Sequence, residues 1–337
     1  MILVTGGTGL VGSHLLYYLS QKNDRIRASF RTEDKLETVK HVFSYYSENP
    51  DELFSKIEWI KCTLNDLPKL TQAFENVTQV YHCAAMVSFD PNDYHQLRNI
   101  NIKGTANIVN LCIANSIEKI CYVSSIAAIG ESETSSIITE DEPWNSDADH
   151  NVYAITKYGA ELEVWRGTQE GVDAVIVNPG IIIGPGYWRS SSGSLFKRIY
   201  KGLKHYTTGI SGYVDIHDVV KSMILLMSSD IKNERYILVA ENWSFKDFSN
   251  KVANELGVPP PKKGATKFQL EVAWRLDWLN YFFKRKYRKL PKQLARSILK
   301  ERNFSNEKIK LDLNFKFKDV NTSIEETSPF FLKDQGL

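Results

Sequence analysis

The sequence predicts an α/β fold, a doubly wound parallel sheet with a smaller C-terminal α+β lobe. Short runs rich in β-branched residues alternate with helical stretches from residue 1 to about residue 180. A glycine-rich turn joins the first run to the first helical stretch. After Pro179 the alternation weakens, and glycine, serine and aromatic residues become frequent. We therefore expect one domain over residues 1–180 and a second lobe over residues 181–337, with the chain free to cross back between them.

The elements of the first domain follow from two periodicities. Apolar and β-branched residues run together in the expected strands, and apolar residues recur at intervals of three and four in the expected helices. The strands are expected at residues 2–5, 25–30, 58–62, 79–82, 119–124 and 174–178, and the helices at residues 11–21, 67–75, 94–114 and 151–168. Such a sheet binds its ligand beyond the carboxyl ends of its strands, so we expect the second lobe to cover that edge and bind substrate.

The composition is that of an ordinary globular chain, with 42% hydrophobic residues, 24% charged residues and a formal net charge of +2. This charge is too small to indicate a polyanionic partner, so no nucleic acid is expected. Met1 leads straight into an apolar strand, and no apolar run is long enough to span a membrane. We therefore expect a cytoplasmic protein with no signal peptide and no membrane partner.

The cysteines and histidines lack the close spacing of a metal or redox site, so no metal centre is expected. The four cysteines lie among apolar residues and are expected to be buried thiols. They are Cys62, Cys83, Cys112 and Cys121.

One segment departs from the even charge balance. Residues 284–289 are locally basic, and Trp274, Trp278, Tyr281 and Phe282 precede them at roughly helical spacing. We interpret the basic run as a solvated helix face and the aromatic residues as core packing. The alternative is a surface patch for nucleic acid or a membrane, because both bind basic residues interleaved with aromatic ones.

The turn after the first strand carries glycines at positions 6, 9 and 12. Gly6 permits the tight turn, Gly9 lets backbone N–H groups approach a pyrophosphate, and Gly12 lets the following helix pack closely on the sheet. Because it stands between a strand and a helix, the turn predicts a dinucleotide-binding Rossmann fold. The expected contacts with the dinucleotide are made by Gly6, Thr8, Gly9, Leu10, Val11 and Gly12.

The residue after the second strand predicts which dinucleotide binds. Arg31 stands where an NAD-specific site carries an acidic residue for the ribose 2′-hydroxyl. A guanidinium can pair with the 2′-phosphate of NADP, and Lys35, one helical turn further on, is a second positive charge. Glu33 and Asp34 weaken the local positive charge. The sequence favours NADP as cofactor, with NAD as the alternative.

Three residue pairs have the spacing Tyr-x-x-x-Lys, and their context separates them. The pairs are Tyr18 with Lys22, Tyr153 with Lys157, and Tyr200 with Lys204. Only Tyr153 and Lys157 follow, at a suitable distance, a strand that ends in a pair of serines, Ser124 and Ser125. We therefore expect Tyr153, Lys157 and one of the two serines to be catalytic.

This trio suits hydride transfer between a cofactor and a carbonyl. Negative charge builds on the carbonyl oxygen during reduction, so a proton donor must stand beside it. Lys157, one helical turn from Tyr153, is expected to lower the pKa of the phenol and to hold the nicotinamide ribose. Ser125 would hydrogen-bond the carbonyl oxygen, with Ser124 as its rival. The trio predicts an enzyme that interconverts a ketone or aldehyde and an alcohol.

These residues resemble the short-chain dehydrogenase/reductase superfamily, specifically its extended branch of epimerases, dehydratases and dihydroflavonol-reductase-like enzymes. Besides the glycine turn, five segments agree in order: residues 82–85, 101–107, 122–125, 178–186 and 213–219. The resemblance implies that Ala84, Ala85 and Pro179 line the cofactor and that Asn101 approaches the active site. It also implies that Ser125 is the catalytic serine.

The sequence departs from the family pattern at two places. Where the family often has Asp-Leu to reach adenine, this chain has Thr63 and Leu64, so a contact from Leu64 would be weaker or made by backbone. Sugar-nucleotide dehydratases carry an acidic pair beside the active-site hydroxyl, whereas residues 125–127 read Ser-Ile-Ala, which disfavours dehydration.

The resemblance implies an NADP(H)-dependent, dihydroflavonol-reductase-like oxidoreductase acting on a small molecule. The alternative is a nucleotide-sugar epimerase that keeps NAD tightly bound. A third hypothesis, a cofactor sensor without activity, would predict a broken trio. The helices at residues 94–114 and 151–168 pair across a two-fold axis in many relatives, which implies a homodimer.

Overall fold

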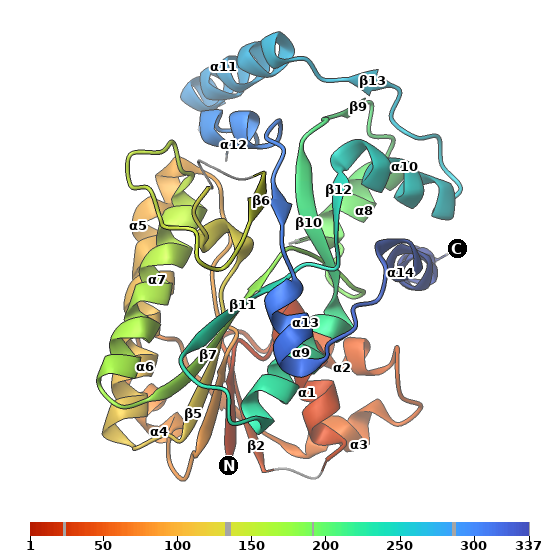
Figure 1. Cartoon of the computed structure of the whole chain (residues 1–337). Helices are drawn as coiled ribbons and strands as arrows, with labels where there is room; N and C mark the ends of the chain where they lie inside the picture. Colours follow the sequence, from red (N-terminus) through yellow and green to blue (C-terminus); the bar gives the residue numbers. More distant parts are fainter. Residues whose placement is uncertain (23–24, 132–135, 191, 285–287, 337) are drawn as a thin grey trace.

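The computed structural model describes residues 1–22, 25–131, 136–190, 192–284 and 288–336 (Figure 1). Its centre is a seven-stranded sheet in the order β11, β7, β5, β4, β1, β2, β3, and all neighbouring strands are parallel. The strands are β1 (Ile2–Thr5), β2 (Ile26–Phe30), β3 (Ile57–Lys61), β4 (Gln79–His82), β5 (Lys119–Val123), β7 (Asp173–Pro179) and β11 (Glu234–Leu238). The strand order reverses between β1 and β4, so the predicted α/β fold class is confirmed.

Helices cover both faces of this sheet, as its apolar strands require. One face packs against α1 (Leu10–Ser20), α2 (Asp34–Phe43), α9 (Ile216–Ser228) and α13 (Glu307–Leu313). The other face packs against α4 (Leu67–Ala73), α6 (Gly104–Ala114) and α7 (Val152–Gln169). A short helix, α3 (Pro50–Ser55), precedes β3.

The six predicted strands form at or within two residues of the expected bounds. The helix expected over residues 94–114 is divided instead: α5 (Tyr94–Leu97) and α6 are joined by a π-helix over Arg98–Lys103. The sequence did not point to α2 or to β11. The latter follows the start of the second lobe, so the chain returns to the central sheet after residue 181.

The second lobe is built on a three-stranded sheet. Its middle strand, β10 (Ile210–Asp215), pairs parallel with β8 (Ile181–Ile183) and antiparallel with β12 (Glu241–Ser244). The helices α8 (Gly193–Tyr200), α10 (Phe245–Glu255) and α14 (Val320–Asp334) share a core with this sheet. Two pairs of two-residue strands complete the lobe: β6 (Ile137–Ile138) with β14 (Asn303–Phe304), and β9 (His205–Tyr206) with β13 (Lys263–Gly264).

Two helices, α11 (Lys267–Lys284) and α12 (Lys292–Ser297), lie together beyond the carboxyl end of the central sheet, at the top of Figure 1. They pack against one another. Among the described residues, no helix combines the length and hydrophobicity that a membrane crossing requires. The four cysteines are free thiols, and burial raises the pKa of each.

Candidate active site

The glycine turn between β1 and α1 has no room for a side chain at Gly6 or Gly12. Gly6 has a φ of +68°, and a Cβ there would lie 2.6 Å from the backbone of Ala84. A Cβ on Gly12 would lie 2.2 Å from the Gly6 carbonyl oxygen. Gly9 is the N-cap of α1, and no side chain caps this helix. The first N–H groups of α1 thus lack a side-chain acceptor, an arrangement that fits a dinucleotide pyrophosphate.

The other three residues expected in this turn differ in exposure. Leu10 is buried, whereas Thr8 and Val11 are half-buried. The Thr8 carbonyl accepts a hydrogen bond of 2.9 Å from the hydroxyl of Tyr187, a residue of the second lobe. The turn is therefore fixed from both parts of the molecule.

Arg31 follows the carboxyl end of β2 and is exposed. Its neighbour Glu33 is engaged by Lys61, with 2.8 Å between the carboxylate and the ammonium. In the part of the chain that the structure describes, neither Arg31 nor the exposed Lys35 forms an ion pair. The positive charge at the end of β2 is thus available to an anion, although Glu33 is close in sequence.

The two serines after β5 have different partners. The Ser124 hydroxyl donates a hydrogen bond of 2.7 Å to the buried carboxylate of Glu161. The Ser125 hydroxyl accepts a hydrogen bond of 3.2 Å from the Ala127 N–H, and its interaction with Tyr153 opposes the rise in the pKa of that phenol. Ser124 is thus held in a buried network, and Ser125 is the serine that lies at the predicted tyrosine.

Tyr153 lies in the first turn of α7, whose N-terminus is capped by the side chain of Asn151. The Phe89 ring packs edge-on against Tyr153 at a centroid distance of 5.6 Å. Desolvation by the surrounding protein raises the pKa of Tyr153 to about 12, and the hydrogen bond with Ser125 opposes this rise. The phenol is therefore protonated throughout the neutral range.

The expectation that Lys157 lowers the pKa of Tyr153 is wrong in this arrangement. The Lys157 ammonium donates to the Tyr122 hydroxyl at 2.6 Å and to the Val123 carbonyl at 2.8 Å. The physical reason is that the side chain leans toward β5, where both acceptors are available. Burial lowers the pKa of Lys157 to about 7, and the nearby Glu161 carboxylate limits the drop.

A chain of buried polar side chains leads from Lys157 to the glycine turn. The Tyr122 hydroxyl, which accepts from Lys157, also interacts with Thr105, which opposes the rise in the pKa of Tyr122. Thr105 is 2.9 Å from the Nε2 atom of His82, and the Nδ1 atom of His82 is 2.6 Å from the Thr5 hydroxyl. Burial lowers the pKa of His82 to about 3, so its ring is neutral. The chain links β1, β4, β5, α6 and α7 at one edge of the sheet.

The π-helix places Asn101 in a buried position between two elements. Its amide donates to the Met86 carbonyl at 3.0 Å and to the Thr156 hydroxyl at 3.1 Å, and its carbonyl accepts from the Met86 N–H at 2.8 Å. Asn101 thereby joins the loop after β4 to α7. π-Helical turns occur often at functional sites because they reposition a side chain. Here the π-helix directs Asn101 toward α7.

The other residues predicted to contact the cofactor differ in burial. Ala84 is half-buried and packs its backbone against Gly6, whereas Ala85 is exposed. Pro179 is buried at the end of β7. Leu64 is buried below α6, and its carbonyl accepts from the Asn107 amide. The side chain of Leu64 is thus core, which leaves its backbone as the part nearest to a ligand.

The other two Tyr-x-x-x-Lys pairs are remote from this site. Tyr18 lies on α1 and hydrogen-bonds His217 through its hydroxyl at 2.8 Å. Tyr200 ends α8 and packs in the core of the second lobe. Their context therefore excludes them as expected.

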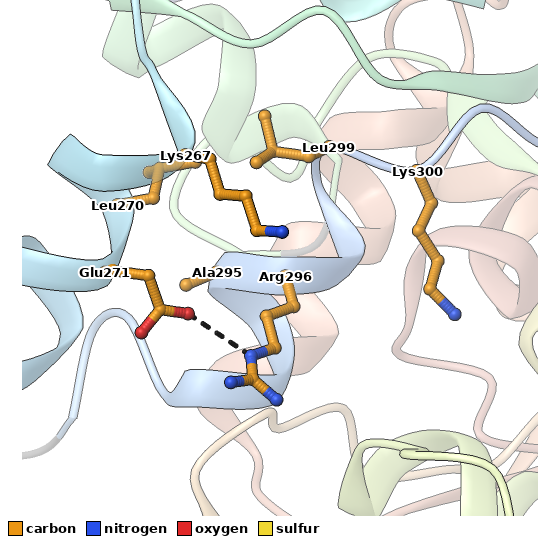
Figure 2. A pocket seen from close by; sticks show the side chains of 7 residues that line it. All are labelled: Lys267, Leu270, Glu271, Ala295, Arg296, Leu299 and Lys300. Carbon is orange, nitrogen blue, oxygen red and sulfur yellow. Dashed lines mark hydrogen bonds and ion pairs between the residues drawn. The ribbon is translucent and has the colours of Figure 1, made fainter.

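A pocket of about 510 Å³ lies between α11 and α12 (Figure 2). Its lining is mainly basic and apolar: Lys267, Leu270, Glu271, Ala295, Arg296, Leu299 and Lys300. The Glu271 carboxylate and the Arg296 guanidinium meet across it at 3.3 Å. None of the catalytic trio lines this pocket, so we place the candidate site by the trio and not by the pocket.

Sequence reasoning missed three residues that support the trio. Tyr122 was noted only as part of a motif, yet it receives the Lys157 ammonium. Glu161 lies one helical turn beyond Lys157 and is buried, and the Arg235 guanidinium of β11 pairs with it at 3.0 Å. The signal for Glu161 is its i+4 spacing from Lys157. No signal in the sequence points to Arg235, because only the return of the chain to the central sheet brings Arg235 to Glu161.

Known proteins resemble this chain in sequence and in fold. The model of the NAD dependent epimerase/dehydratase family matches residues 2–239. The chain is 31% identical over 270 residues to a putative dihydroflavonol 4-reductase of Synechocystis, covering 77% of this chain and 73% of that protein. It is 27% identical over 248 residues to cinnamoyl-CoA reductase 1 of Petunia hybrida, covering 70% and 72%. The UDP-glucose 4-epimerase of Thermotoga maritima shares the fold, with a TM-score of 0.77, 18% identity and 99% coverage of both chains.

Proposed function

This chain belongs to the NAD-dependent epimerase/dehydratase family, and from that premise we propose that it is an NADP(H)-dependent reductase of a ketone or aldehyde on a small organic molecule. The observation that carries the proposal is the interaction of Tyr153 with Ser125 at the carboxyl end of β5, with Lys157 one turn along α7. The sequence relatives named as reductases support it.

The nicotinamide cofactor, when bound, supplies the hydride that goes to the carbonyl carbon. The glycine turn and the uncapped start of α1 would hold its pyrophosphate, and Arg31 and Lys35 would hold the 2′-phosphate of NADP. Ala84, Ala85 and Pro179 would line the remainder. These residues belong to the cofactor site that we propose.

Tyr153 delivers the proton that completes the reduction. Its raised pKa keeps the phenol protonated at neutral pH, so it can donate to the carbonyl oxygen as negative charge develops there. Ser125 donates a second hydrogen bond and holds that oxygen in reach of Tyr153. The Lys157 ammonium, which is held by Tyr122 and the end of β5, adds positive charge to this edge of the sheet when it is protonated.

Cofactor titration of the purified protein tests the choice of NADP. NADPH should bind more tightly than NADH. Arg31→Ala should weaken the binding of NADPH by about tenfold and leave the binding of NADH nearly unchanged. Arg25→Ala is the matched control, because Arg25 is an exposed arginine at the opposite end of β2. Equal affinity of the wild type for the two cofactors would refute the NADP assignment.

The epimerase alternative has a different signature in the same preparation. An epimerase would retain NAD through purification and would interconvert a nucleotide sugar without net oxidation of added NADPH. The similarity of the fold to a UDP-glucose 4-epimerase keeps this alternative in view. Release of stoichiometric NAD on denaturation, with no NADPH turnover against a panel of carbonyl compounds, would replace the reductase proposal.

Two expectations about the protein's surroundings complete the proposal. We infer a homodimer through α6 and α7, where Ile155 and Leu162 are exposed apolar residues on α7. Light scattering of wild type and Leu162→Glu tests it, because a monomeric wild type contradicts the inference.

We also place the protein in the cytoplasm, in keeping with its four free cysteines.

A further inference from the structure

The segment of residues 261–300, which includes α11 and α12, has an unusual charge. It carries twelve Lys and Arg residues against two Asp and Glu residues, whereas the rest of the chain carries 30 against 38. A chain that is nearly neutral as a whole is thus divided into a strongly basic segment and an acidic remainder. Such asymmetry marks a surface for an anionic partner.

The outward side of α11 is mainly apolar, with the exposed Arg275 among its apolar residues. Phe268, Val272, Leu276, Leu279 and Phe283 recur at intervals of three or four residues and are all exposed. Trp278 and Phe282 widen this stripe, so half of the fourteen exposed large apolar side chains among the described residues lie on this helix. We call these seven residues the α11 face. The expectation that Trp278 and Phe282 pack in the core is therefore wrong.

The opposite side of α11 is already packed, so the α11 face cannot be buried by rotating the helix. Leu270 is buried beside α12, and the Glu271 carboxylate, at the border of the α11 face, bonds the Arg296 guanidinium of α12 (Figure 2). Asp277 accepts from the Arg288 guanidinium at 3.3 Å and from the Lys289 N–H at 3.0 Å. A helix that is apolar on both sides buries one side within the protein and needs a second environment for the other.

Both acidic residues of the segment are neutralised within it. Glu271 also accepts hydrogen bonds from the Trp274 indole and the Arg275 guanidinium, which lowers the pKa of its carboxyl to about 2. The exposed lysines Lys267 and Lys289 form no ion pair in the described part of the chain. The charge offered to a partner is therefore positive. Residues 285–287 of the basic run lie outside the described residues.

We propose that the α11 face binds the surface of an anionic phospholipid bilayer. The apolar stripe would enter the interface between headgroups and acyl chains, and the flanking lysines would meet the lipid phosphates. A nucleic acid would leave the exposed Phe and Leu side chains in water. A second copy of the chain would bring two strongly positive segments together. The bilayer is the one partner of the three that satisfies both the apolar stripe and the positive charge.

This surface is connected to the candidate active site. The Arg288 N–H, just beyond α11, donates to the Asp90 carboxylate at 2.9 Å. The adjacent Phe89 packs against Tyr153. Binding at the α11 face would thus hold the active-site loop near the membrane surface, whatever the substrate is.

The test is cosedimentation of the full chain with vesicles of phosphatidylcholine alone or mixed equally with phosphatidylglycerol. Binding should require phosphatidylglycerol and weaken with added salt. Replacing Phe282 and Phe283 together by serine should reduce binding about tenfold or more. The matched control is Leu311→Ser, because Leu311 is 80% exposed on α13, outside the segment.

Two double charge-reversal variants distinguish electrostatic attraction to the lipid from nonspecific adsorption. Lys267→Glu with Lys289→Glu should reduce binding about tenfold or more, whereas Lys22→Glu with Lys316→Glu, also exposed, should not. Equal binding to both vesicle types, or equal loss in the control variants, would overturn the proposal. The proposal would also be overturned if the phenylalanine variants left vesicle binding unchanged and instead altered self-association or binding to duplex DNA. Because the readout is sedimentation, failure here is independent of the proposed reductase activity.

Discussion

The candidate site and the α11 face depart from the usual burial rule in opposite directions. At the site, ionisable and polar groups such as Lys157, His82 and Glu161 are buried, and each has partners among its neighbours. On α11, large apolar groups such as Phe268 and Phe283 are each 78% exposed. Folding alone favours neither arrangement. Burial of polar groups costs free energy, and an exposed apolar side chain does not contribute the stabilisation that its burial would give. Both departures therefore indicate function.

The largest expected effect comes from removing one oxygen at the site. Tyr153→Phe keeps the ring against Phe89 but removes the proton donor, so kcat for carbonyl reduction should fall by roughly a thousandfold. Tyr200→Phe, in a pair with the same spacing, should stay within about twofold of wild type. Steady-state turnover of NADPH measures both. A Tyr153→Phe enzyme with near-normal kcat would break the assignment of the trio.

The two serines should separate activity from stability. Ser125→Ala should lower kcat about a hundredfold with little change in the free energy of unfolding, because its hydroxyl lies at Tyr153. Ser124→Ala should instead cost about 1–3 kcal/mol of unfolding free energy, because it removes a donor from the buried Glu161 carboxylate. Urea unfolding and turnover of each variant give the comparison. Exchange of the two phenotypes would reverse the roles given to the serines.

The pKa of Lys157, lowered to about 7, predicts a pH dependence. Its ammonium is charged below that value, so kcat/KM for reduction should fall as pH rises through about 7, while Tyr153 stays protonated to about 12. Glu161, Cys83, His82 and Tyr122 surround the ammonium, and the pKa of His82 is too low for it to titrate in this range. A pH profile of Lys157→Arg should lack the fall near 7. A wild-type rate that is flat from pH 6 to 9 would contradict the assignment.

The same lysine links pH to stability with a definite sign. Its pKa is about 7 when folded against an ordinary 10.5, so between these values the unfolded chain holds the extra proton. The unfolding free energy contributed by Lys157 should therefore rise with pH over that window. Thermal unfolding of wild type and Lys157→Met at pH 7 and 10 checks it, since the difference between them should shift in favour of wild type at the higher pH.

The smallest expected effect belongs to the α11 face. Trp278→Ser should change the free energy of unfolding by less than about 0.5 kcal/mol, because the side chain is 48% exposed. Tyr122→Phe, at the buried site, should cost more because it leaves the Lys157 ammonium without one acceptor. Urea denaturation of both variants tests the contrast. A large loss in Trp278→Ser would mean that the α11 face is structural.

Local patterns determined most of the first half of the molecule. Each strand, the glycine turn and the pair of serines are marked within a few consecutive residues, so six of the seven strands of the central sheet followed from sequence, whereas β11 did not. The elements that carry Ser125, Tyr153 and Lys157 followed in the same way. A β-strand or a helix is favoured by short-range periodicity, which a sequence displays directly. The Tyr153 pair was separated from its two competitors by context of the same kind.

Tertiary structure alone decided how those residues are used. Only packing turned Lys157 toward Tyr122, gave Ser124 to Glu161, brought Arg235 back to the sheet on β11, and left large apolar side chains of α11 exposed. Each of these depends on contacts between residues far apart in the chain. The apolar pattern of α11 indicates that burial of its side chains is favourable. The pattern does not determine whether protein or another environment covers them. That choice depends on what the fold places beside the helix.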